Sequence, residues 1–221
     1  MKRRFKNRTQ AGQLLAKRLI AYAHRSEVIV LALPRGGVPV AFEVAKVLNA
    51  PLDICLVRKL GVPGHKELAM GAIAMGGAMV INEAVVTELG ISTETINRVA
   101  FEEQKELERR HHAYRGNRRA LNIEGRKLIL IDDGIATGST LRAALATLQQ
   151  QQPVGIIVAV PVAPPSICNQ LELKIEKVVC LKTPHPLYAI GIWYEDFLQT
   201  TDEEVRNLLA QAPWRQESVS R

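Results

Sequence analysis

Two adjacent aspartates followed by a loop of small and hydroxyl residues carry the clearest chemical signal in this chain. Asp132 and Asp133 come directly after the aliphatic run Leu128–Ile131, at the point where a buried strand would leave the core. Carboxylates there need partners, because burying unpaired charge is costly. Their oxygens could accept hydrogen bonds from sugar hydroxyls or bind magnesium.

The loop after the aspartates, GIATGST, offers donors for a phosphate. Its small residues let backbone amides converge on an anion at the start of the next helix, whose dipole adds attraction. Thr137, Ser139 and Thr140 add hydroxyl donors. Sugar acceptors beside phosphate donors describe a site for ribose 5-phosphate. A capped helix behind a polar turn is the alternative, but it does not explain why the carboxylates, glycines and hydroxyls coincide.

Two further segments could contact phosphates. The turn LPRGGV at Leu33–Val38 follows a predicted strand, and its glycines permit backbone conformations closed to other residues. Exposed amides and the Arg35 guanidinium could clamp a diphosphate there, although a plain turn with a surface arginine is the alternative. The segment Arg58–Ala69 (RKLGVPGHKELA) is polar and contains two glycines, so we predict a mobile loop.

These segments require an alternation of strands and helices. Apolar runs predict strands at Val28–Leu33, Leu52–Val57, Leu128–Asp132, Val154–Val160 and Val178–Leu181, and Gly76-Gly77 indicates a hairpin. Helices are predicted at Val38–Leu48, Ser92–His112, Thr140–Gln151 and Pro165–Leu173, with Asp202 capping a last one. The alternation predicts an α/β fold with a parallel sheet and helices on both faces. Ligands of such sheets bind beyond the carboxyl ends of the strands.

Composition is typical of a globular cytoplasmic protein. The 221 residues are 47% hydrophobic and 23% charged, without a secretory signal or an apolar run of the ~20 residues that span a bilayer. Cys55, Cys168 and Cys180 are far apart and lack metal-ligand spacing, so we interpret them as reduced core residues.

The net charge of +7 has several readings. Basic residues gather in two clusters: Lys2, Arg3, Arg4, Lys6 and Arg8, then Arg109, Arg110, Arg115, Arg118 and Arg119. A solvated tail and a solvated helix end are the simplest interpretation. Steering of an anionic substrate or binding of RNA is also compatible.

The segment LILIDDGIATGST at Leu128–Thr140 resembles the PRPP signature of the type I phosphoribosyltransferases. Most of residues 9–210 are also similar to a bacterial group of predicted phosphoribosyltransferases that carry LPRGGVPVA, RKLG and WYEDF. The resemblance implies one phosphoribosyltransferase domain over residues 1–221 with a Rossmann-like parallel sheet. It also implies a flexible loop hairpin at 58–82 and a small C-terminal hood at 182–200, joined by the N-terminal segment.

The same resemblance implies roles for individual residues. The expected PRPP-binding residues are Arg35, Gly36, Gly37, Arg58, Lys59, Asp132, Asp133, Gly134, Ala136, Thr137, Gly138, Ser139 and Thr140. Of these, Arg35, Lys59, Asp132 and Asp133 would be catalytic: the aspartates hold the ribose hydroxyls, and the two cations contact the pyrophosphate. Trp193 or Tyr194 would stack on the acceptor base, or else serve only as packing under the hood.

The implied reaction transfers ribosyl 5-phosphate from PRPP to a nitrogenous acceptor and releases pyrophosphate. It would need Mg²⁺, carried mainly by PRPP with no protein metal ligand assigned, in a homodimer without a membrane partner. Hypoxanthine-guanine enzymes carry an aspartate where this chain has Ala136, which moves the expectation away from 6-oxopurines without naming the acceptor. A PRPP- or nucleotide-sensing regulator, with RNA as a partner, is the alternative on the same fold.

Overall fold

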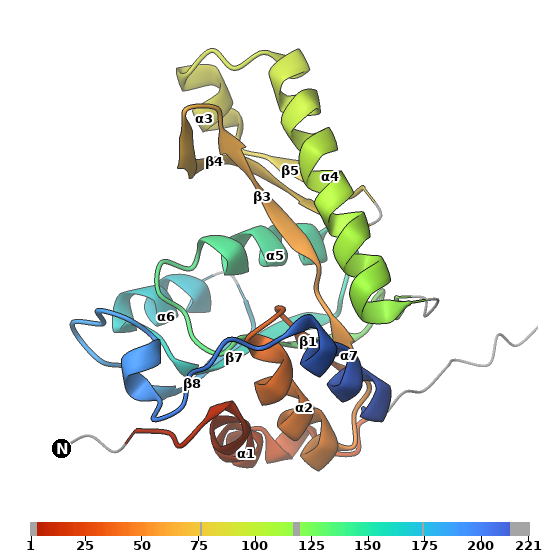
Figure 1. Ribbon diagram of the computed structural model, residues 1–221, viewed down its shortest axis with the longest axis vertical. Coiled ribbons are helices and arrows are strands. Elements are labelled where there is room, and N and C mark those ends of the chain that lie inside the picture. Colours follow the sequence, from red (N-terminus) through yellow and green to blue (C-terminus); the bar gives the residue numbers. More distant parts are fainter. Residues whose placement is uncertain (1–3, 76, 117–119, 174, 213–221) are drawn as a thin grey trace, which may run out of the picture. The chain divides into compact units, whose positions relative to one another are not determined.

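The computed structural model describes residues 4–75, 77–116, 120–173 and 175–212 (Figure 1). The chain forms two compact units, described below over those residues. The first comprises residues 1–54, 120–136 and 153–221, and the second comprises residues 55–119 and 137–152. That all of residues 1–221 act as a single domain stays a prediction. No described helix is both long and apolar enough to cross a membrane.

A parallel five-stranded sheet forms the centre of the first unit. Its strands are ordered β2 (Leu52–Ile54), β1 (Val28–Ala32), β6 (Lys127–Ile131), β7 (Gly155–Val162) and β8 (Lys177–Lys182). All neighbouring pairs are parallel. Every residue of β1 and all but the first of β6 are buried, which is why these strands read as unbroken aliphatic runs. The predicted α/β fold is confirmed.

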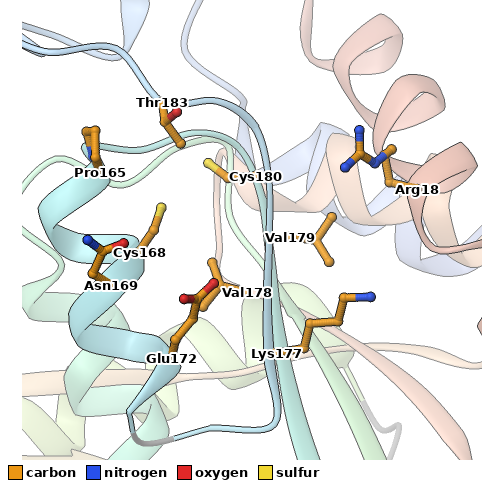
Figure 2. Close-up of a pocket in the computed structure, with 10 residues that line it drawn as sticks. All are labelled: Arg18, Pro165, Cys168, Asn169, Glu172, Lys177, Val178, Val179, Cys180 and Thr183. Carbon is orange, nitrogen blue, oxygen red and sulfur yellow. The ribbon is translucent and has the colours of Figure 1, made fainter.

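Helices lie on both faces of this sheet (Figure 1). On one face, α1 (Arg8–Arg18) packs on α2 (Gly37–Leu48), α1 contacts β7 and β8, and α2 contacts β1, β2 and β6. On the other face, α6 (Pro165–Glu172) packs on β8 (Figure 2). The buried Val40, Val44 and Leu48 of α2 recur at helical spacing, so the helix presents one apolar stripe.

The last helix of the first unit, α7 (Asp202–Gln211), packs on α2. Its N-cap is Thr201, whose hydroxyl accepts a hydrogen bond from the Glu204 amide at 3.0 Å, so the prediction of Asp202 as the cap is wrong by one residue. Asp202 instead joins Glu203 and Glu204 in the first turn, where negative charge is favoured by the helix dipole.

The second unit is built on an antiparallel sheet ordered β3 (Val57–Val62), β4 (His65–Ala74) and β5 (Met79–Ile81). Its helices are α3 (Glu83–Glu88), α4 (Thr93–Arg115) and α5 (Ser139–Gln149); α4 and α5 pack on β3 and β4. Ser92 caps α4 as predicted, accepting from the Thr95 amide. The β4–β5 pairing confirms the predicted hairpin, although Gly76 lies outside the described residues.

The segment Arg58–Ala69, predicted as a mobile loop, has regular secondary structure, because most of it forms β3 and the start of β4. The polar composition of the segment hides an alternation at the end of β3: Leu60 and Val62 are buried, whereas Gly61 between them is less so. Gly64, with φ of +81°, forms the tight connection between the strands. The mobility of this segment stays a prediction.

The second basic cluster is partly a solvated helix surface, as the simplest interpretation predicted. Arg109 and Arg110 both pair with Glu106 at 2.7 Å on α4. Their guanidinium groups lower the pKa of Glu106 to about 2. Arg115 departs from that interpretation, since it is only 8% exposed. Arg118 and Arg119 lie outside the described residues, as do Lys2 and Arg3 of the first cluster.

Candidate functional site

The order of strands in the first unit predicts where a ligand would bind. From β1, the chain crosses to β2 on one side, and the sheet continues with β6 on the other. In open α/β sheets, the crevice outside the carboxyl ends of the strands at such a reversal is the usual ligand site. The turns that leave β1 and β6 at this point are Pro34–Gly36 and Asp132–Ala136, two of the segments that the sequence singles out.

The two turns approach each other so closely that only glycine fits between them. A Cβ atom on Gly36 would lie 2.0 Å from Oδ2 of Asp133, and one on Gly37 would lie 2.7 Å from the Ile131 carbonyl oxygen. The Leu33 amide donates to that same carbonyl at 2.8 Å, which extends the pairing of β1 and β6 into the turn. The peptide bond between Pro34 and Arg35 is cis. The glycines therefore place the LPRGGV turn directly against the acidic pair.

The acidic pair is an enclosed and electrostatically unfavourable arrangement. Oδ1 of Asp132 accepts a hydrogen bond from the Asp133 amide at 2.8 Å. Burial raises the pKa of Asp132 well above its ordinary value, and the negative charge of Asp133 raises it further. Burial also raises the pKa of Asp133, while the Arg8 guanidinium opposes that rise. Strongly perturbed carboxyls at a sheet edge are typical of functional sites.

Arg8, at the start of α1, is the residue of this site that the sequence analysis missed. Its Nε and Nη2 both lie 2.8 Å from Oδ2 of Asp133. Nη1 donates to the Leu198 carbonyl at 2.7 Å, and the guanidinium carbon lies 3.9 Å from the centroid of the Phe197 ring. Its assignment to a solvated basic tail is therefore wrong. No local signal could have found this pair, because its members are 125 residues apart in the chain.

The N-terminal segment lies beside the predicted hood. The Phe5 amide donates to the Trp193 carbonyl at 2.8 Å, and the Phe5 carbonyl accepts from the Glu195 amide at 2.8 Å. The Tyr194 ring is 2% exposed and stacks on Phe197 at 4.8 Å between centroids. Its hydroxyl donates to the Asp133 carbonyl oxygen at 2.6 Å. Tyr194 thus fits the packing alternative, since its buried ring is not accessible to a base.

Arg35, the predicted diphosphate ligand, is only loosely held. Its Nη1 lies 3.3 Å from Oδ1 of Asp202, and the two side chains are 35% and 37% exposed. An ion pair this exposed contributes little to stability. The side chain can therefore exchange Asp202 for an anionic ligand at small cost.

The residues that follow the acidic pair are held by contacts within the first unit. A Cβ atom on Gly134 would lie 2.6 Å from the Ile190 side chain, so this position also requires glycine. The next amide, that of Ile135, donates to the Val162 carbonyl at 2.9 Å and anchors the loop to the end of β7. Ala136, the last residue of the loop in this unit, is exposed.

The hydroxyl residues of the same segment lie at the start of α5, in the second unit. Gly138 has a φ of +75° and is the N-cap residue, so it has no side chain with which to cap the helix. Oγ1 of Thr137 and Oγ of Ser139 lie 3.2 Å apart, and Thr140 is exposed. Uncapped amides at a helix N-terminus beside two hydroxyls form a favourable environment for a phosphate.

The predicted loop cations lie on β3 in the second unit. Arg58 pairs through Nε with Glu103 of α4. Adjacent residues of a strand point to opposite faces of the sheet, so Lys59 cannot share the direction of Arg58. Lys59 stays the candidate pyrophosphate contact that the sequence analysis predicts, with Arg58 beside it in the chain.

Comparison with known proteins places these features in a family. A family model described as the phosphoribosyl transferase domain matches residues 64–185, more than half of the chain. The Mycobacterium tuberculosis protein named "Putative phosphoribosyl transferase Rv0571c" is 43% identical over 208 residues, which cover 94% of this chain and 47% of that protein. This chain therefore spans about half the length of the curated relative it matches.

Two further proteins are similar to this chain, one over most of its length and one over a part of it. The crystal structure of TT1426 from Thermus thermophilus is 40% identical with a TM-score of 0.85, covering 93% of this chain and 97% of that one. An adenine phosphoribosyltransferase of Corynebacterium kroppenstedtii is 33% identical over 92 residues, which cover 39% of this chain and 49% of that enzyme.

Proposed function

Because this chain belongs to the phosphoribosyl transferase domain family, we propose that it transfers the ribosyl 5-phosphate of PRPP to a nitrogenous acceptor and releases pyrophosphate. The observation that carries the proposal is the contact between the two turns at the reversal of strand order. There, Gly36 leaves room for the Asp133 carboxylate. The LPRGGV turn, which we assign to the diphosphate, therefore lies against the acidic pair, which we assign to the ribose.

In the proposed complex, Asp132 and Asp133 accept hydrogen bonds from the ribose hydroxyls. Arg8 holds Oδ2 of Asp133 through a hydrogen bond from Nε and an ion pair with Nη2, so this carboxylate is oriented before a ligand arrives. Arg8 also supplies positive charge next to two carboxyls whose burial favours protonation. Fixed acceptors reduce the entropy that must be lost when the sugar is oriented for reaction.

The pyrophosphate leaves with negative charge that the protein must stabilise. We assign Arg35 and the amides of Gly36 and Gly37 to this role, with Lys59 as a further cation. The weak pair of Arg35 with Asp202 suits the role, because the arginine gives up little when it turns to the diphosphate. Cations placed where charge develops in the transition state are a major source of catalysis. Thr137–Thr140 are assigned to the 5-phosphate.

Magnesium fits this proposal as part of the substrate. Among the described residues, no three His, Cys, Asp or Glu side chains form a group that could hold a metal ion. The diphosphate oxygens of PRPP are the ligands that Mg²⁺ prefers, and this ion commonly binds through substrate phosphates with few protein carboxylates. When bound, it would neutralise charge on the departing pyrophosphate.

For the acceptor, adenine is the first base to test. Ala136 lacks the carboxylate found at this position in the hypoxanthine-guanine enzymes, and part of the chain matches an adenine phosphoribosyltransferase. Trp193 stays the candidate for stacking on the base. A homodimer is also a prediction, tested by light scattering.

Calorimetry with Mg·PRPP tests the ribose assignment. Asp132→Asn and Asp133→Asn should each weaken binding by at least tenfold, about 1.4 kcal/mol. Glu195→Gln is the matched control: it also removes one negative charge, but from an exposed residue, and should leave the affinity unchanged. Equal affinities of all four proteins would refute the assignment.

Pyrophosphate release separates an enzyme from a regulator. The purified protein is incubated with Mg·PRPP and one free base at a time, beginning with adenine. Release that requires one base and is lost in Asp132→Asn supports a transferase. Binding of PRPP without release with any base, combined with salt-sensitive RNA binding, would support the regulatory alternative instead.

A further inference from the structure

A pocket of about 340 Å³ lies beside the edge strand β8, between it and neighbouring helices. Its walls include Cys168 and Glu172 from α6, Cys180 from β8, and Thr183 just after β8 (Figure 2). None of the residues expected to bind PRPP or the acceptor lines it. The pocket therefore belongs to a different part of the first unit's surface from the proposed active site.

The two cysteines of this pocket are in direct contact. Their sulfur atoms point toward one another from α6 and β8 (Figure 2), and the thiols are hydrogen-bonded. Cys180 also donates to the Lys182 carbonyl oxygen, with Sγ at 3.4 Å. Cys168 is 7% exposed, whereas Cys180 is half-buried and opens onto the pocket. Two thiols this close, with solvent access through a pocket, can be oxidised together.

The pair is chemically asymmetric. The hydrogen bond with Cys180 lowers the pKa of Cys168, although burial and the charge of Glu172 act against this. The same hydrogen bond, together with burial, raises the pKa of Cys180. Cys168 is therefore the thiol that ionises first, and the thiolate is the reactive form toward oxidants.

We propose that Cys168 and Cys180 form a redox modification site, in which a hydroperoxide oxidises them to an intramolecular disulfide. The Cys168 thiolate attacks the peroxide oxygen, giving a sulfenic acid and hydroxide. The Cys180 sulfur then attacks the Cys168 sulfur, and water leaves as the S–S bond forms. In total, two thiols lose two electrons and two protons, and one hydrogen peroxide is reduced to two waters.

Oxidation would alter the connection between β8 and the segment that follows it. Cys180 would lose the S–H group that it donates to Lys182, and α6 would become covalently tied to β8. The Lys182 carbonyl would keep its hydrogen bond from the Ala163 amide at 3.2 Å. The modification thus changes the start of the predicted hood without touching the acidic pair.

Peptide mapping of the full-length protein tests the proposal directly. Reduced protein is treated with a small excess of hydrogen peroxide, blocked with iodoacetamide and digested with trypsin. Cleavage after Lys174 and Lys177 separates the two cysteines, so a disulfide would join peptide 143–174 to peptide 178–182. The expected result is this cross-linked species, with an intact mass lower by two hydrogens and restored by dithiothreitol.

Single substitutions provide the controls. Cys168→Ser and Cys180→Ser should each abolish the cross-linked peptides, whereas Cys55→Ser, which alters a buried cysteine of the second unit, should leave their yield unchanged. The wild-type digest needs no variant, so a misfolded mutant would not obscure the result. Over-oxidation of Cys168 to sulfinic acid without a cross-link, or persistence of both alkylated thiols, would overturn the proposal.

Discussion

Replacing Arg8 by alanine should lower the free energy of unfolding of the first unit by more than a typical substitution near a chain terminus does. The substitution removes a hydrogen bond and an ion pair with Asp133, a hydrogen bond to the Leu198 carbonyl and the contact with the Phe197 ring. It also leaves the Asp133 carboxylate beside Asp132 without its cation. Burial already raises the pKa of both carboxyls, so an uncompensated charge at this position is costly.

The expected loss follows from the exposure of the pair. Removing one partner of a fully buried ion pair costs about 3–5 kcal/mol. The Arg8 and Asp133 side chains keep 12% and 14% of their surface exposed, so water relieves part of that cost. The cation–π contact adds about 0.5–1 kcal/mol. We therefore expect Arg8→Ala to lower the free energy of unfolding by about 2–4 kcal/mol.

Urea unfolding followed by tryptophan fluorescence measures this loss, because Trp193 lies in the segment paired with Phe5. Arg8→Lys should lose less, since it keeps the charge. In the Asp133→Asn background, Arg8→Ala should cost at least about 1 kcal/mol less than in the wild type. Lys17→Ala, which removes an exposed cation of the same helix, should change stability by less than about 0.5 kcal/mol. A similarly small effect of Arg8→Ala would refute the reasoning.

Three further predictions concern the same site. Asp132→Asn should raise stability while it weakens PRPP binding. Because burial raises the pKa of this acid, the gain in thermal unfolding should be small in acid, grow as the pH rises from the ordinary aspartate pKa toward the raised one, and level off above it. Gly36→Ala should lower stability by about 1–3 kcal/mol in urea, since the added Cβ would lie 2.0 Å from Asp133, and an unchanged midpoint would contradict the close approach. Tyr194→Phe should cost about 1–3 kcal/mol by the same measurement, because it leaves the enclosed Asp133 carbonyl without its 2.6 Å donor; a loss below about 0.5 kcal/mol would show that water replaces the hydroxyl.

Local sequence patterns predicted the elements that hold the site. The strand β6 and the N-terminus of α5 could be predicted because aliphatic runs, small residues and hydroxyls act through their immediate neighbours. The alternation of apolar and polar residues predicts a strand less well where the two faces of the strand differ little in burial. The segment at Arg58–Ala69 looked polar throughout, and only the pairing of β3 with β4 distinguishes its buried residues from its exposed ones.

The sequence by itself determined that an acidic pair and a glycine turn follow strands of one parallel sheet, because each motif lies within a few residues of the apolar run that predicts its strand. Only the tertiary structure decided what surrounds them. Arg8 reaches Asp133, Tyr194 turns from a candidate base contact into a buried donor, and Cys168 meets Cys180. Such contacts depend on strand register and helix packing, which join residues far apart in the chain and leave no local pattern.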